Sequence, residues 1–268
     1  MAEGIPAGGP RHADRGIPPL RYFGRVIGLP PVWLESRAPF ENMRLRGTPT
    51  YAGDGLPRGD GQPVLLIPGF MAADRSLATL RDWLLRMGYH AEIPGLAFNV
   101  RYSEAVLNTV NLHLVDLYGW LGQKVTLVGH SRGGLLAKVA AHRHPEMVER
   151  VVALGAPLAD PFDISPFTMA GVRLAQLFNL VRFGQTGEVE RPFLDDLAAP
   201  TSRPLTSIYS RTDGIVHWRA CIRADAECVE VAGSHVGLAV NPDVYAVLAR
   251  LLASSERPTA RGSSETSA

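Results

Sequence analysis

A serine between two glycines is the residue with the clearest chemical potential in this sequence. Ser131 lies in Gly129-His130-Ser131-Arg132-Gly133, directly after the apolar run Val125–Val128 and before a segment with helical periodicity. This order of strand, tight turn and helix is typical of a nucleophile elbow, in which a strained turn exposes a serine hydroxyl at the carboxyl end of a sheet. The glycines let the turn pass close to neighbouring backbone. We therefore expect Ser131 to be a nucleophile.

A serine hydroxyl is a weak nucleophile at neutral pH, so a base must accept its proton and an acid must orient that base. In folds with such an elbow the two partners follow the serine, the acid first and the histidine second. Among the histidines after Ser131, His142 and His144 belong to the elbow helix or its end, and His217 lies beside Trp218. His235 lies in a loop before the closing helix, so we expect it to be the base.

The acid is expected at Asp213, because this residue follows the apolar strand Leu205–Tyr209. The carboxyl ends of parallel strands lie at one edge of a sheet, where the elbow serine is also expected. The other aspartates belong to an insertion or to a loop without a preceding strand: Asp160, Asp163, Asp195, Asp196 and Asp225. Asp213 would orient the imidazole of His235 and stabilise its protonated form.

An acyl-transfer site also needs hydrogen-bond donors for the oxyanion. One expected donor is the backbone N–H of Arg132, the residue after the nucleophile. The other is expected in the loop after Val64–Ile67, where Pro68-Gly69 precedes Phe70. Phe70 is the preferred donor and Met71 the alternative; a simple strand stop at Pro68-Gly69 is the structural interpretation that stays open.

The elements around these residues alternate between short apolar strands and amphipathic helices, which predicts an α/β fold with a doubly wound, mostly parallel sheet. Residues 1–60 are rich in Pro and Gly and predict an irregular N-terminal arm. Its apolar stretch Tyr22–Leu34 could dock on the core or on a lipid surface. Residues 61–253 are expected to form the main domain, with a cap insertion at about 158–200, and residues 254–268 a disordered tail.

Composition excludes several classes of function. The chain has 268 residues, of which 46% are apolar and 20% charged, and its formal net charge is +1. Such a balance argues against a nucleic-acid partner.

We find no signal peptide, no stretch of transmembrane length, no phosphate-binding glycine motif and no metal-ligand cluster, so we expect no cofactor, no metal and no integral membrane segment. A cytoplasmic location is expected, with peripheral membrane contact or leaderless export as alternatives. The oligomeric state stays open.

The sequence contains two cysteines, Cys221 and Cys228. They cannot form a disulfide framework. Two free thiols are expected, and a single disulfide closing a small loop is the alternative.

From about Pro63 to Leu252 the sequence resembles the α/β-hydrolase superfamily, and more narrowly its bacterial lipase and esterase-like members. The similarity is carried by LLIPGF, LVGHSRGG, SRTDGIV and GSHVGLAVNP, in that order. It implies Ser131 as nucleophile, Asp213 as acid and His235 as base, with Phe70 and Arg132 as oxyanion donors. Many relatives have His-Gly in the oxyanion loop, whereas this chain has Pro68-Gly69.

The resemblance also implies an acyl pocket beneath the cap. We expect the substrate to contact a set of mostly apolar residues near the elbow and in the cap: Met71, His130, Phe167, Met169, Leu174 and Phe178. The apolar cap residues could instead pack on the core. The expected function is hydrolysis of a small-molecule carboxylic ester or lipid through an acyl-enzyme. Acyl transfer or thioester hydrolysis with the same triad is the alternative, followed by ligand binding on an inactive scaffold.

Overall fold

The computed structural model describes residues 32–72, 74–96, 100–184 and 190–254. Most of the stretch Tyr22–Leu34 and nearly all of the expected tail lie outside these ranges. Within them, six parallel strands form one sheet in the order β2-β1-β3-β4-β5-β6. Their bounds are β1 Pro63–Ile67, β2 His90–Glu92, β3 Val125–His130, β4 Val148–Leu154, β5 Leu205–Tyr209 and β6 Glu227–Glu230. The predicted doubly wound parallel sheet is confirmed.

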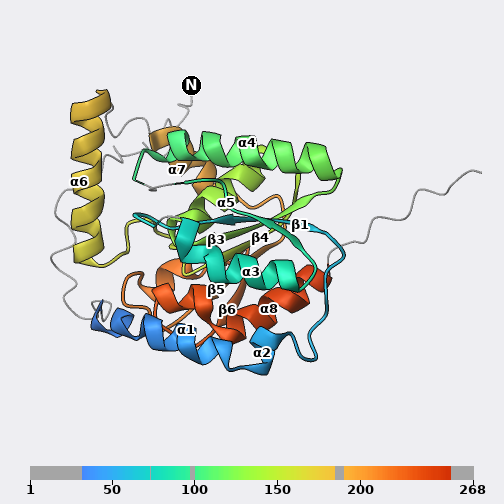
Figure 1. Cartoon of the computed structure of the whole chain (residues 1–268). Helices are drawn as coiled ribbons and strands as arrows, with labels where there is room; N and C mark the ends of the chain where they lie inside the picture. Colours follow the sequence, from blue (N-terminus) through green and yellow to red (C-terminus); the bar gives the residue numbers. More distant parts are fainter. Residues whose placement is uncertain (1–31, 73, 97–99, 185–189, 255–268) are drawn as a thin grey trace, which may run out of the picture.

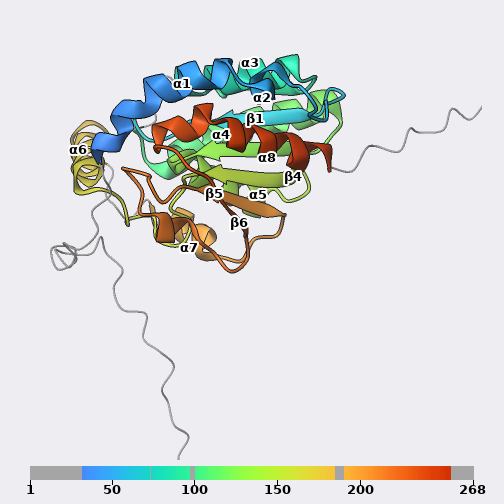
Figure 2. The ribbon, with the colours of Figure 1, turned by 90° about the horizontal axis from the view of Figure 1, so that it is seen from below.

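Helices cover both faces of this sheet (Figures 1 and 2). One face carries α1 (Ala38–Arg46), α2 (Pro49–Ala52), α3 (Ala78–Arg86) and α8 (Pro242–Ala253), and the other carries α4 (Ser103–Leu121), α5 (Arg132–Arg143) and α7 (Arg191–Ala198). Short 3₁₀ segments connect them: η2 (Val32–Arg37), η3 (Asp74–Leu77), η5 (Trp218–Cys221) and η6 (Val236–Val240).

Side-chain alternation along β1 explains why the sheet needs cover on both faces. Val64 and Leu66 join the cluster beneath α3 and α8, whereas Leu65 and Ile67 join the cluster beneath α4 and α5. All four side chains are fully buried. A strand that is apolar on both sides is stable only in the middle of a three-layer arrangement.

The N-terminal region differs from the expected irregular arm, because residues from Val32 to Ala52 are largely helical. Its prolines start helices instead of breaking them: Pro39 lies in the first turn of α1, and Pro49 begins α2. Proline is compatible with these positions, since a helix's first N–H groups have no intrahelical acceptor. Helix α1 packs on η6, and α2 packs on α8. The segment therefore forms part of the packed domain.

The insertion between β4 and β5 contains α6 (Pro166–Phe183) and α7. Figure 1 shows α6 standing at one side of the body, whereas α7 lies against α5. Backbone hydrogen bonds tie the start of the insertion to the segment after β5, from Ser165 N to Ile215 O (2.7 Å) and from His217 N to Asp163 O (3.1 Å). None of the helices in the described ranges has the length and apolar character needed to cross a membrane.

Candidate active site

Ser131 lies between β3 and α5 in a strained backbone conformation, with φ 54° and ψ −125°. Its N–H donates to Leu154 O (2.7 Å), and its carbonyl accepts from Gly134 N (2.9 Å). A Cβ at Gly133 would overlap the carbonyl oxygen of Ile67. The turn can pass β1 this closely only because Gly133 has no side chain. Close packing thus holds a non-glycine residue in a conformation that costs about 1–3 kcal/mol.

His235 and Asp213 form a buried pair at the same edge of the sheet. His235 Nδ1 lies 2.6 Å from Asp213 Oδ2, and the two side chains are only 4% and 2% exposed. The other carboxylate oxygen, Oδ1, accepts from the backbone N–H groups of Ile215 (2.8 Å) and Val216 (2.7 Å). A carboxylate held in this way accepts the Nδ1 proton of the imidazole, which leaves Nε2 as a proton acceptor.

The pKa of His235 is set by opposing influences. Burial lowers it, but the negative charge and hydrogen bond of Asp213 and the charge of Glu35 raise it, so the pKa lies above its ordinary value. A histidine in this environment is a stronger base than a free imidazole, and it can stabilise the proton that it takes up.

His130, which was expected to contact substrate, is instead buried against His235. Its ring centroid lies 4.8 Å from that of His235, and its Nε2 lies 2.9 Å from the carbonyl oxygen of His235. Burial and the neighbouring His235 lower the pKa of His130 to about 4. A neutral His130 can therefore donate its Nε2 proton to that carbonyl. Since His130 directly precedes Ser131, this contact places the turn of Ser131 beside the loop that carries His235.

Ser131 opens on a cavity of about 1030 Å³. The two residues expected to donate to an oxyanion, Phe70 and Arg132, line the same cavity. Much of the remaining wall is apolar and comes from α5, α7 and the segments flanking α6: Leu135, Pro157, Leu158, Ile164, Phe193, Leu194 and Leu197. Insertion residues thus line a mostly apolar chamber beside Ser131, of a size suited to a small organic ligand.

The backbone of the loop after β1 is also strained. Met71 has φ 55°, and within the described residues Met71 and Ser131 are the two non-glycine residues with positive φ. Ala72 N donates to Gly69 O (3.2 Å) across this turn, and a Cβ at Gly69 would lie 3.1 Å from the Cβ of Ser131. Strained backbone in two neighbouring turns, at Met71 and at Ser131, is characteristic of sites where function constrains geometry.

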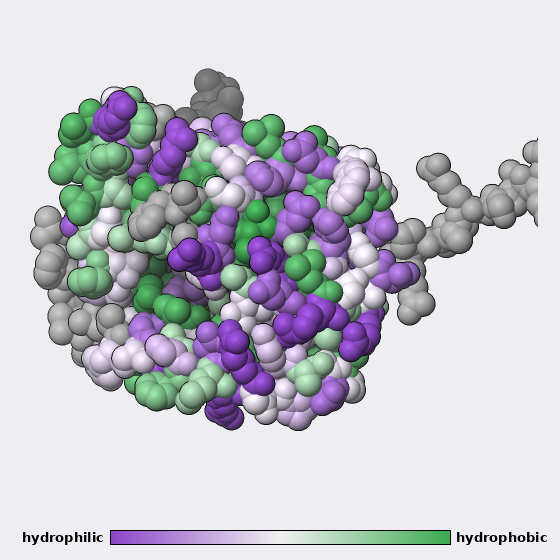
Figure 3. All heavy atoms as spheres, in the orientation of Figure 1, coloured by the Kyte–Doolittle hydropathy of each residue, from purple (hydrophilic) through white to green (hydrophobic). Residues whose placement is uncertain are grey.

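The expected substrate contacts in α6 lie on the wrong face of the helix. Phe167, Leu174 and Phe178 are 81%, 68% and 56% exposed. The face that lines the cavity carries smaller or polar residues: Thr168, Val172, Ala175, Gln176 and Asn179. A helix facing an open chamber has no core to fill, so its larger apolar side chains do not have to point inward. Figure 3 shows apolar side chains gathered over this outer part of α6.

The remaining two expected contacts, Met71 and Met169, also lie outside the cavity lining. Met71 is 53% exposed. Its side chain lies beside α6 instead, where its sulfur would be 3.6 Å from a Cβ added at Gly171.

Sequence reasoning missed two carboxylates from the N-terminal segment. Glu35 of η2 accepts hydrogen bonds from Gly214 N (2.8 Å), His235 N (2.9 Å) and Val236 N (2.9 Å). Glu41 of α1 accepts from the N–H of Ser234 (3.0 Å) and from its hydroxyl (2.5 Å). Neither residue belongs to a recognisable motif, and no spacing in the sequence connects them with a loop about two hundred residues later.

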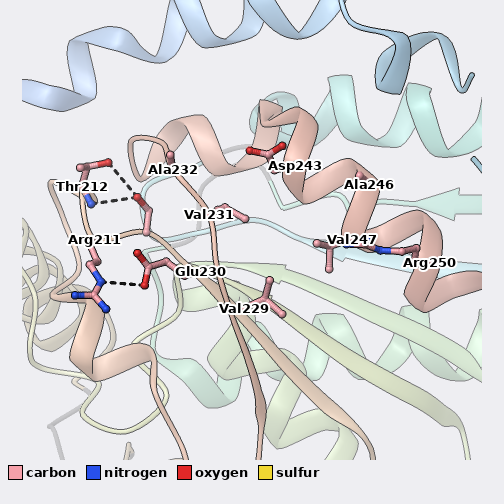
Figure 4. A pocket seen from close by; sticks show the side chains of 11 residues that line it. Arg211, Thr212, Val229, Glu230, Val231, Ala232, Asp243, Ala246, Val247 and Arg250 are labelled. Atoms are coloured by element: carbon pink, nitrogen blue, oxygen red, sulfur yellow. Dashed lines mark hydrogen bonds and ion pairs between the residues drawn. The ribbon is translucent and has the colours of Figure 1, made fainter.

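A second cavity of about 640 Å³ lies on the surface between β6, α8 and the loop after β5 (Figure 4). Four of the polar side chains that line it bond to other parts of the protein. Arg211 Nε pairs with Glu230 (2.9 Å), while the hydroxyls of Ser210 and Thr212 both donate to Gly233 O (2.7 and 2.9 Å). These bonds join the loop that carries Asp213 to the loop that carries His235.

The two cysteines are free thiols, as expected. Cys221 is buried and Cys228 is exposed. Burial raises the pKa of Cys221 well above its ordinary value, so this thiol is a poor nucleophile. In the ranges that the structure describes, no three His, Cys, Asp or Glu residues gather as metal ligands would.

Comparison with known proteins agrees with this architecture. Residues 101–179, which include Ser131, match a family model described as alpha/beta hydrolase fold. No curated protein matches the sequence significantly.

Many solved structures share the fold. The chain is similar to a mature lipase from Bacillus licheniformis, with 16% identity and a TM-score of 0.54 over 74% of this chain and 94% of that one. It is also similar to a monoacylglycerol lipase from Paleococcus ferrophilus, with 16% identity and a TM-score of 0.50 over 72% and 95% of the two chains. Aspergillus fumigatus lipase B shares 15% identity and a TM-score of 0.52 over 73% of this chain and 53% of the lipase. Together with the parallel sheet and the match over residues 101–179, these similarities show that the chain has the α/β-hydrolase fold.

Proposed function

We propose that this protein is a serine hydrolase that cleaves carboxylic esters with a hydrophobic acyl group. The observation that carries the proposal is the position of Ser131. It lies in a strained turn on the wall of an apolar cavity, and the elbow that holds it contacts the loop of His235, whose imidazole is hydrogen-bonded to Asp213 at 2.6 Å. Two of the structural neighbours are named lipases, which supports an ester as the substrate. At 16% identity, the structural similarity itself shows a shared fold.

In this proposal His235 Nε2 takes the proton of Ser131 Oγ as that oxygen attacks the ester carbonyl. The backbone N–H groups of Phe70 and Arg132 stabilise the resulting oxyanion, each contributing roughly 3 kcal/mol. Collapse of the tetrahedral intermediate breaks the C–O bond, and the alcohol leaves with the proton from His235. Water then gives its proton to His235, attacks the acyl-enzyme and releases the acid. Asp213 stays ionised and stabilises the imidazolium in both steps.

The cavity supports a hydrophobic acyl group. Leu158, Ile164, Phe193 and Leu197 form an apolar wall in the cavity that Ser131 lines. Burial of one CH₂ group in such a wall contributes about 0.8 kcal/mol, so the binding free energy rises with acyl length until the chamber is full. The residues of the insertion act as a cap in this proposal, because they separate the acyl group from water.

Hydrolysis of p-nitrophenyl esters with acyl chains from short to long tests the proposal. We expect the wild type to turn over with an optimum at intermediate length, and Ser131→Ala to lose about 10⁴-fold or more in kcat/KM. Ser254→Ala is the matched control, since Ser254 is an exposed serine at the end of α8 and its hydroxyl bonds only to Leu251 O in the described contacts. It should retain wild-type kcat/KM.

The alternative chemistries give different outcomes in the same assay. If added alcohol diverts the acyl group from acid to a new ester at a low alcohol concentration, the protein is an acyltransferase. Faster turnover of acyl thioesters than of oxygen esters would instead make it a thioesterase. Absence of turnover with every ester, together with failure of a fluorophosphonate to label Ser131, would refute the serine hydrolase proposal.

A further inference from the structure

The base loop, residues 233–237, carries His235 but lies outside any strand or α-helix. Backbone N–H groups of such a segment need acceptors from elsewhere when they are shielded from water. In this protein the acceptors for Ser234, His235 and Val236 are side-chain carboxylates from η2 and α1. The geometry of the base therefore depends on residues about two hundred positions earlier in the chain.

Glu35 has the more direct contact with the candidate site. One of its oxygens, Oε1, accepts both Gly214 N–H (2.8 Å) and His235 N–H (2.9 Å), while Oε2 accepts Val236 N–H (2.9 Å). Gly214 directly follows Asp213. A single carboxylate oxygen thus joins the backbone beside the acid to the backbone of the base.

The carbonyl side of His235 is held as well. Its carbonyl oxygen receives the hydrogen bond from His130 Nε2 at 2.9 Å. The peptide groups on both sides of the imidazole are therefore fixed, one by Glu35 and one by the residue next to the nucleophile. Hydrogen bonds to a charged carboxylate, such as those of Glu35, are shorter and stronger than neutral ones, so they limit rotation of the whole loop.

Glu41 adds a second anchor of the same type, at Ser234. Space for it exists because position 237 is a glycine: a Cβ at Gly237 would overlap Glu41 Oε2. The loop sequence Gly233-Ser234-His235-Val236-Gly237 is therefore complementary in shape to the carboxylates of the N-terminal segment.

We propose that Glu35 is a positioning residue for the reaction: its carboxylate holds the backbones of Asp213 and His235 in register and places a negative charge beside the imidazole. The inference rests on the proposed serine hydrolase function. Glu35 is not among the described residues that line the cavity, so it acts through His235 and makes no contact with substrate. The charged and titratable groups around His235 are Asp213 from the β5 loop, His130 from β3, Glu35 from η2 and Glu41 from α1, which contacts the adjacent Ser234.

Two substitutions separate the charge of Glu35 from its hydrogen bonds. Glu35→Gln keeps a carbonyl oxygen that can bridge Gly214 and His235, but it removes the negative charge and the acceptor for Val236 N–H. Glu35→Ala removes both. Glu146→Gln is the matched control, because the Glu146 side chain is 58% exposed and approaches only His144, at 3.9 Å, in the described ion pairs.

The measurements are kcat, KM and the pH dependence of kcat/KM on the preferred p-nitrophenyl ester, with NMR titration of the His235 ring in the intact protein. We expect Glu35→Ala to lower kcat by about 10- to 100-fold with KM within about twofold of the wild type, because misplacement of the base affects the transition state. Glu35→Gln should lose less than about tenfold. Both should shift the acidic limb of the profile, and the His235 titration, to lower pH by a few tenths of a unit, because a nearby negative charge is gone.

The inference is overturned if both variants keep the wild-type profile and titration while the wild type hydrolyses esters. It is also overturned if activity falls only in proportion to the unfolded fraction measured by circular dichroism, since this would reflect stability alone. The NMR titration needs no turnover. A wild type without esterase activity would thus refute the proposed function, and an unshifted His235 titration in Glu35→Gln would refute the inference separately.

Discussion

The proposed nucleophile, Ser131, and the proposed base, His235, are held in opposite ways. Ser131 is fixed by its own neighbours in the chain, through the packing of Gly133 against β1 and the start of α5. His235 is fixed by groups from distant segments, namely Asp213, His130 and Glu35. The comparison indicates that close backbone packing can produce a strained turn locally, whereas an irregular loop acquires a single conformation only when remote side chains satisfy its backbone.

Removing the negative charge of Asp213 is the most severe test of how distant groups hold His235. Asp213→Asn should lower kcat/KM roughly 10⁴-fold, because the amide no longer holds the imidazole in the tautomer that accepts a proton at Nε2. Steady-state kinetics on the preferred ester measure this loss. Asp82→Asn serves as the control, since Asp82 is half-exposed on α3 and pairs with Arg81. A loss below about tenfold in Asp213→Asn would show that another acid orients His235.

A methyl group at Gly133 tests how close packing holds the turn of Ser131. Gly133→Ala should lower the free energy of unfolding by about 3 kcal/mol, because its Cβ would overlap the carbonyl oxygen of Ile67 and the backbone must shift. Urea denaturation measures the change. Gly119→Ala is the matched control: Gly119 lies inside α4 with no atom within 4 Å of an added Cβ, so alanine should stabilise the helix by up to about 1 kcal/mol. Equal effects of the two substitutions would contradict the packing argument.

Acidification should lower the free energy of unfolding through His130, which packs against His235. Its pKa is about 4 in the folded protein, whereas an unfolded histidine has about 6.5, so between these values only the unfolded state takes up the proton. The contribution of His130 to the free energy of unfolding therefore falls by roughly 2 kcal/mol from about pH 7 to about pH 5. His130→Gln keeps an amide that can donate to His235 O but does not titrate.

Denaturant unfolding of both proteins at neutral pH and at about pH 5 measures this contribution as the difference between their acid sensitivities. We expect His130→Gln to lose less stability than the wild type on acidification. An equal loss in the two proteins would show that His130 is not the group whose protonation opposes folding in this range.

The local structure that holds Ser131 could be predicted from the sequence. The strand Leu205–Tyr209 was correctly predicted at both ends, and the elbow's strand and helix appeared where the apolar run and the glycines indicated. Such features depend on periodicity and steric limits within a few residues, which a single sequence contains. Asp213 could be selected because it follows a recognisable strand, and His235 because it lies in a loop before the closing helix. In the structure the two side chains lie within hydrogen-bond distance.

The contacts that the N-terminal segment makes with the loop of His235 could not be predicted. Nothing near Glu35 distinguishes it from a solvated glutamate, since the groups that donate to it are backbone amides, which carry no side-chain signal. The orientation of α6 was also mispredicted: large residues such as Phe178 were expected to face the substrate, but they face outward. Burial rules assume a filled core, and they fail where a helix borders a cavity instead.

The anchoring of His235 by Glu35 also has a consequence for the order in which the protein folds. The two residues are separated by 200 positions, so Glu35 is synthesised long before the loop that it binds. Closing so long a segment is entropically costly and slow, whereas the elbow between β3 and α5 involves neighbours only. During synthesis the nucleophile's turn can thus form well before the base is in place. The chain acquires its complete site at the end of folding, when the last strand and α8 have joined the sheet and the early N-terminal helices have docked beside them.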